Sequence, residues 1–264
     1  MTATLALARR MLHERRRLLL WLCVSMVAMV LAVMALYTSI GVQYGKLFAD
    51  LPEALLNLFG GGDFGTPAGY LETELLSFVA PGLVLGVAIA FGAGTLAGSE
   101  QAGHLALVFT APVSRIRVAL ASLATTVFAV VAMTVTMWLS MLVGNEIGSV
   151  HLAISRLTAV SVMLGLLGIA TGALAFAVGA ATGARGLAVG ASTAVAVASY
   201  LVYALAPLSE TTNPFRYISL WYPYSANRPV LHGISVAHAL VLVVLAVLFA
   251  AVGTLALDRR DVNG

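Results

Sequence analysis

The sequence predicts an all-α integral membrane protein with six transmembrane helices, and two observations lead to this prediction. Of 264 residues, 61% are apolar and only 9% are charged, and the mean hydropathy is +1.00. One soluble core cannot bury that much apolar surface. Six stretches also reach the roughly 20 apolar residues that a helix needs to cross a bilayer. They are residues 18–40, 75–97, 118–143, 157–180, 187–208 and 234–257.

We expect these stretches to be helices rather than barrel strands. Backbone polar groups in lipid must find partners within their own segment, and none of the six alternates apolar and polar residues. They leave little room for a soluble domain, so residues 1–264 are interpreted as one transmembrane domain. The first stretch follows basic residues but extends over 23 residues without a clear cleavage site, so we expect it to be retained. Cys23 is the only cysteine, which rules out an intrachain disulfide.

Residues 1–17 are expected to form an N-terminal interfacial helix, because a helical wheel separates a basic face from an apolar face. The basic face holds Arg9, Arg10, His13, Arg16 and Arg17, and the apolar face holds Met1, Leu5, Ala8, Met11 and Leu12. The alternative is a basic flank that only sets the topology. The wheel alone does not separate these two interpretations.

The basic residues also predict the orientation in the membrane. If both termini lie on one side, that side carries ten arginines and the other side carries four basic residues. The ten are Arg9, Arg10, Arg15, Arg16, Arg17, Arg115, Arg117, Arg185, Arg259 and Arg260, and the four are Lys46, Arg156, Arg216 and Arg228. The positive-inside rule therefore places both termini in the cytoplasm. The net charge of +3 follows from this topology, and we expect no nucleic-acid partner.

The connections on the other side contain two notable segments. Residues 51–59 are expected to form a short amphipathic helix that ends at the glycines of residues 60–62. These glycines are not a P-loop, because no Lys followed by Ser or Thr comes after them, so this chain is not expected to hydrolyse ATP. Residues 213–224 are rich in aromatics, as expected for a belt at the outer interface, and an exit gate for substrate is the alternative.

The predicted spans contain small-residue pairs but no Asp, Glu, Lys or Arg. The glycine pairs are 82/86, 94/98, 168/172, 179/183 and 186/190, and we interpret them as sites of tight internal helix packing. Without charges at membrane depth, an ion or proton relay is disfavoured, and the energy source is expected to lie elsewhere. His238 alone falls in a span, where a solvated or hydrogen-bonded structural role is expected.

Enzymatic alternatives lack their motifs. No Gly-x-Ser-Gly nucleophile and no His-Glu-x-x-His pair is present. The other histidines have no metal-ligand spacing, and we expect them to be structural: His13, His104, His151 and His232.

The most informative segment lies between the second and third spans, at residues 99–115. Gly98 permits the second span to end, Ser99 is placed to cap a short helix that runs to Thr110, and Glu100 falls in its first turn. Pro112 stops this helix, and Ser114 is placed to cap the third span. The short helix has an apolar face that solvent alone would not require. It would be a re-entrant or interface-lying loop helix without a partner, or it would dock into a partner protein.

The spacing in this segment resembles the cytoplasmic coupling segment of the ATP-binding-cassette type-2 permease family. That family has a Glu-x-x-Gly-x-Leu pattern followed by Pro-x-Ser-Arg. The coupling residues implied by this resemblance are Glu100, Gly103, His104, Leu105, Leu107, Phe109, Pro112, Ser114 and Arg115. Residues 257–261 are similar to the basic end that follows the sixth helix in the family, and the six spans also agree.

The resemblance implies a permease subunit of an ATP-driven exporter in the plasma membrane. It would form the path for a lipophilic or amphipathic substrate, such as a drug, an antibiotic or a lipid-like molecule. It would pair with a second permease copy or a paralogue and with two cytoplasmic ATPase subunits. Those subunits would hold ATP and Mg, and this chain would need no cofactor or metal. Two alternatives are a membrane assembly or binding subunit without an ATPase, and a six-helix lipid-modifying enzyme, which the missing polar cluster disfavours.

Overall fold

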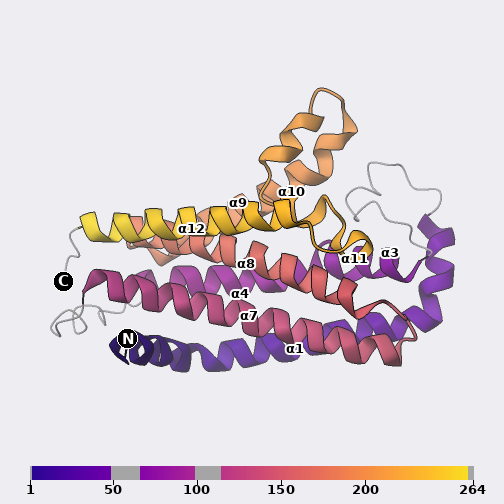
Figure 1. Ribbon diagram of the computed structural model, residues 1–264, viewed down its shortest axis with the longest axis horizontal. Coiled ribbons are helices and arrows are strands. Elements are labelled where there is room, and N and C mark those ends of the chain that lie inside the picture. The colour runs from indigo at the N-terminus through magenta and orange to yellow at the C-terminus, as the bar shows by residue number, and fades with distance from the viewer. Residues whose placement is uncertain (1, 49–65, 99–113, 261–264) are drawn as a thin grey trace.

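The computed structural model describes residues 2–48, 66–98 and 114–260, which form helices and connecting turns without a strand. Six helical segments in these ranges are long and apolar enough to cross a membrane, which confirms the predicted fold class. The long helices are α1 (Thr2–Phe48), α4 (Val79–Thr95), α7 (Arg115–Ile147), α8 (Ile154–Thr182), α9 (Arg185–Leu205) and α12 (Val236–Arg259). They run side by side as a bundle (Figure 1). α1 begins and α12 ends at the same end of this bundle, which we call the terminal end.

α8 lies at the centre of the bundle. It packs against α4, α7, α9 and α12, while α1 packs mainly against α7. In the most apolar stretch of α8, 72% of the residues are buried, compared with 22% in α9 and 17% in α12. α9 and α12 therefore present most of their surface to lipid or to another chain.

Glycines bring α8 close to its neighbours. A Cβ atom added to Gly168 would lie 2.8 Å from Val84 Cγ1, and one added to Gly172 would lie 2.7 Å from Thr126 Cγ2. The interpretation of tight internal packing therefore holds for this pair. It does not hold for pairs 82/86 and 186/190, because added Cβ atoms there would meet nothing within 4 Å.

α1 contains 47 residues and would be about 70 Å long if straight, more than twice the hydrocarbon thickness of about 30 Å. Residues 2–17 are helical and continuous with the first span, with no break between the two. Met11 on the predicted apolar face is buried, while the basic face is exposed. The placement of this segment along a membrane surface stays a prediction.

The opposite end of the bundle is built from short elements. They are α3 (Pro67–Leu71), the π-helix η1 (Glu72–Leu76), the 3-10 helices η2 (Ala206–Leu208) and η3 (Asn213–Ile218), α10 (Tyr222–Ser225) and α11 (Pro229–His232). Helical structure before α4 thus begins at Pro67, earlier than the predicted residue 75. The reason is local, because Pro67 fits the first helical position and the Thr66 hydroxyl accepts a hydrogen bond from the Gly69 N–H at 3.2 Å.

Candidate coupling site

The predicted coupling residues divide into two groups. Seven lie outside the described residues: Glu100, Gly103, His104, Leu105, Leu107, Phe109 and Pro112. The structure describes Ser114 and Arg115, which lie at the start of α7 at the terminal end of the bundle. The predicted short helix and its capping residue Ser99 also lie outside the described residues. What the structure defines is how the chain is anchored on both sides of residues 99–113.

Ser114 occupies the N-cap position of α7, as predicted, with an extended backbone at φ −67° and ψ 145°. Its carbonyl accepts hydrogen bonds from the N–H groups of Arg117 at 2.9 Å and Val118 at 3.3 Å. The expected capping bond from its hydroxyl is not formed. The start of this helix is therefore set by the backbone of Ser114.

Arg115 reaches from the start of α7 to the end of α12. Its Nη1 donates to the carbonyls of Asp258 at 2.9 Å and Arg260 at 2.8 Å, with a longer contact of 3.5 Å to Leu257. α12 ends at Arg259, and its last carbonyls have no partner within the helix. The guanidinium satisfies these carbonyls at the negative end of the helix dipole.

Arg260 makes the same type of contact with α8. Its Nη1 donates to the carbonyl of Ala180 at 3.0 Å, two residues before α8 ends at Thr182. The following Gly183 has a left-handed φ of +67°, which favours glycine. A Cβ on Gly183 would also lie 2.8 Å from the Arg260 guanidinium, so glycine leaves the space that this side chain needs.

Arg15 of α1 binds the last turns of α4. Its Nη1 donates to the Ala90 carbonyl at 3.1 Å and its Nη2 to the Gly94 carbonyl at 2.7 Å. A side chain at Gly94 would overlap the guanidinium, so this glycine makes room for an arginine rather than for a helix backbone. The predicted packing role of Gly94 is corrected accordingly. α4 ends at Thr95, and after a turn at Leu96 the chain is helical again at Ala97 and Gly98.

An apolar cluster at the terminal end joins these helix ends. We call it the terminal cluster, and its buried members are Met11, Leu96, Val118, Ala119, Ala121, Phe176, Ala180 and Leu257. They come from α1, the residue after α4, α7, α8 and α12. Both flanks of residues 99–113 therefore pack on the same core. Met11, which belongs to the predicted apolar face of residues 1–17, is therefore buried against other helices of the protein.

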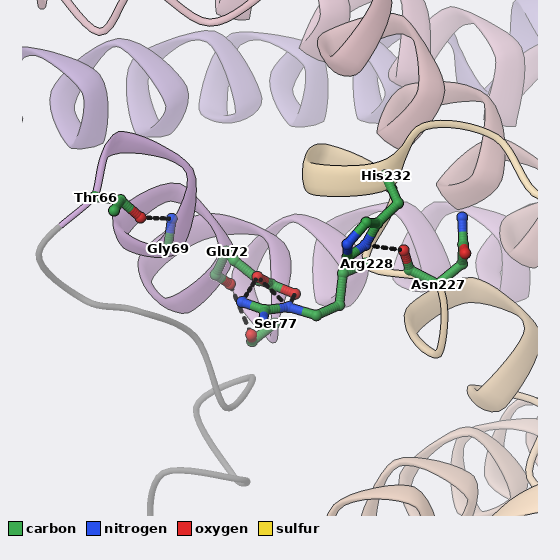
Figure 2. A network of polar contacts seen from close by, with 7 residues as sticks. All are labelled: Thr66, Gly69, Glu72, Ser77, Asn227, Arg228 and His232. Carbon is green, nitrogen blue, oxygen red and sulfur yellow. Dashed lines mark hydrogen bonds and ion pairs between the residues drawn. The ribbon is translucent and has the colours of Figure 1, made fainter.

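A second polar network lies at the opposite end (Figure 2). Glu72 is 7% exposed and accepts from Arg228 Nε at 3.0 Å with each carboxylate oxygen and from Nη2 at 2.6 Å. The Ser77 hydroxyl donates to the Glu72 carbonyl at 2.6 Å, and His232 Nδ1 lies 3.0 Å from the Asn227 carbonyl. The sequence analysis counted Arg228 only as a loop charge and did not pair it with Glu72, because 156 residues separate the two.

The aromatic segment at residues 213–224 is partly buried. The rings of Tyr203, Tyr217 and His238 lie around Tyr222, at centroid distances of 6.4, 4.8 and 5.5 Å. The Tyr224 hydroxyl donates to the Leu76 carbonyl at 2.8 Å, and burial raises the pKa of Tyr224 above its ordinary value. This segment therefore anchors the C-terminal end of η1 in addition to any contact with the interface. Its role as an exit gate stays a prediction.

His238 was expected to be a solvated or hydrogen-bonded structural histidine, and within the described part of the chain its Nδ1 is neither. It faces the Tyr222 ring edge-on, and its buried Nδ1 has no hydrogen-bond partner among the residues that the structure describes. Within the same ranges, no three His, Cys, Asp or Glu side chains lie close enough to hold a metal ion.

These observations define a multi-pass α-helical membrane protein whose polar contacts are concentrated at the two ends of its bundle. A family model described as ABC-2 family transporter protein matches residues 5–262, and the chain belongs to this family. The predicted resemblance is thus confirmed. Members of the family are membrane subunits rather than enzymes, and membership implies partnership with an ABC ATPase subunit. No curated protein matches the chain significantly.

Proposed function

We propose that this chain is the permease subunit of an ATP-driven exporter. The observation that carries the proposal is the family match over nearly the whole chain, together with six apolar helices long enough to span a bilayer. The chain would form the path for a lipophilic or amphipathic substrate in the plasma membrane. ATP and Mg would be bound by a separate ATPase.

Residues 99–115 are proposed to contact that ATPase. Support comes from the sequence pattern and from the way the flanks are held, since Arg15 binds the preceding helix and Arg115 begins the following one. Two copies of the ATPase would lie in the cytoplasm beneath two permease copies or paralogues. ATP binding would bring the ATPase subunits together and push on residues 99–115, and hydrolysis would reset the transporter.

The apolar grooves of the bundle support a lipophilic substrate. One groove of about 200 Å³ lies between α4 and α9 and is lined by Phe78, Gly82, Gly86, Ile89, Tyr200 and Trp221 among others. Because α9 is mostly unburied, a second permease could pack against this side and enclose the groove. The groove offers hydrocarbon and aromatic surface, which suits an apolar or amphipathic molecule.

The first test is to purify the chain from its native membrane in mild detergent and to identify the proteins that accompany it. We expect a stoichiometric P-loop ATPase, and we expect it to be lost when the whole stretch from Gly103 to Phe109 is disrupted. The single substitutions Glu100→Ala and Gly103→Leu should instead keep the ATPase attached and hydrolysing ATP but reduce transport. A chain that purifies without any nucleotide-binding protein would instead favour an assembly or binding subunit.

A further inference from the structure

Three helices that end at the terminal end of the bundle are each capped by an arginine from another part of the chain. α4 is capped by Arg15, α8 by Arg260 and α12 by Arg115. Between 75 and 145 residues separate each donor from its acceptor. These contacts therefore tie together elements that the chain itself does not join at this end.

Two of these contacts share one residue. The carbonyl of Arg260 accepts from Arg115 at 2.8 Å, and the guanidinium of Arg260 donates to the Ala180 carbonyl at 3.0 Å. Arg260 follows the last residue of α12 and has an extended backbone at φ −87° and ψ 130°. Arg115 is therefore linked to Arg260 by one hydrogen bond, and the side chain of Arg260 continues this link to the end of α8.

We propose that Arg115 and Arg260 form a relay that carries movement of the start of α7 into α12 and α8. Both are positioning residues, and the inference rests on the proposed function. α8 is the most buried of the long helices and contacts four of the others, so a shift of its end reaches most of the bundle. On the other flank, Arg15 holds α4 to α1.

The geometry of Arg115 predicts which substitution preserves the relay. A single nitrogen, Nη1, makes all of its contacts with the end of α12. A lysine ammonium offers three donors at one point, whereas alanine offers none. Arg115→Lys should therefore retain at least half of the transmitted movement, and Arg115→Ala should abolish it.

The test uses the complex of this chain with its ATPase in lipid nanodiscs. Cys23→Ser removes the only native cysteine. Spin labels are then placed one at a time at exposed positions: Ile116 on α7, Leu255 on α12 and Ala181 on α8. The measured quantity is the change in label mobility between the nucleotide-free complex and the complex trapped with ADP and vanadate.

In the complex that keeps both Arg115 and Arg260, the mobility of all three labels should change when the nucleotide is trapped. Arg115→Ala should keep the response at 116 and reduce those at 255 and 181 at least fivefold. Arg260→Gln should reduce only the response at 181. The exposed arginines Arg117 and Arg259 supply matched controls, and their alanine variants should keep all three responses.

The outcomes separate failure of the relay from failure of the proposed function. Unchanged responses at 255 and 181 in Arg115→Ala, or equal losses in Arg117→Ala, would overturn the relay alone. If no label responds in the unsubstituted complex, the proposed function is contradicted and the relay falls with it. Size-exclusion chromatography and retention of the ATPase check assembly. Should Arg115→Ala fail to assemble, Arg260→Gln still tests the second step.

Discussion

At the scale of single residues, Arg228 shows how a distant partner can stabilise an unfavourable backbone. Its φ of +44° and ψ of 72° lie in the left-handed region, which costs a non-glycine residue about 1–2 kcal/mol. The fork of its guanidinium meets both oxygens of the buried Glu72 carboxylate. Such a charge-assisted pair offsets the backbone cost and holds α11 against η1.

Glu72→Gln is expected to destabilise the protein, because it removes the buried negative charge that the Arg228 guanidinium contacts with two of its nitrogens. Removing one partner of a fully buried pair costs about 3–5 kcal/mol. The Arg228 side chain is 29% exposed, so we expect about 2 kcal/mol here. For a chain of this size that corresponds to a fall of roughly 4–8 °C in the unfolding midpoint, which thermal unfolding in detergent would measure.

Glu14→Gln is the matched control for this substitution. It removes the same charge from the exposed Arg10–Glu14 pair, where the oxygen and nitrogen are 3.5 Å apart. An exposed pair of this type contributes at most about 0.5 kcal/mol, so the midpoint should hardly change. Equal effects of the two substitutions would show that the Glu72–Arg228 pair contributes no more than a surface pair.

At the scale of elements, the contact between α4 and α8 depends on a backbone approach. A Cβ added to Gly92 would overlap the carbonyl oxygen of Gly172 on α8. A backbone atom cannot rotate away as a side chain can, so the two helices would have to separate. Gly86, on the same helix α4, has open space around its Cα.

Gly92→Ala should therefore destabilise the bundle, while Gly86→Ala should be neutral or slightly stabilising. Overpacking costs about 1–3 kcal/mol or more. Alanine by itself favours a helix over glycine by about 1 kcal/mol, and this gain is common to both variants. The yield of monodisperse protein and the unfolding midpoint would measure the difference. Comparable behaviour of the two variants would mean that the approach of α4 to α8 is looser than described.

At the scale of the whole molecule, the orientation in the membrane is a testable consequence of the charge distribution. With Cys23 replaced by Ser, a single cysteine at the exposed Thr211 should react with an impermeant maleimide in intact cells. A single cysteine at the exposed Asp258 should react only after the membrane is opened. The positive-inside rule predicts this result, and the reverse labelling pattern would invert the proposed topology.

The arginine contacts at the terminal end and the Glu72–Arg228 pair at the opposite end show where prediction from the sequence stopped. The sequence analysis placed Arg115 in the candidate site, and the structure adds that it binds the end of α12. Arg15, Arg260 and Glu72 were not predicted as anchoring residues. Their partners lie 75 to 156 residues away, and local spacing does not reveal which helix ends meet.

The sequence alone determined that this protein crosses a membrane with apolar helices, and it indicated the family to which the chain belongs. It could do so because a helix satisfies its own backbone hydrogen bonds, so length and apolarity are local properties of the chain. Only the tertiary structure decided which arginine caps which helix end and which glycines make close contacts. Those choices depend on how distant helices pack, because a side-chain hydrogen bond forms only where donor and acceptor are brought within about 3 Å.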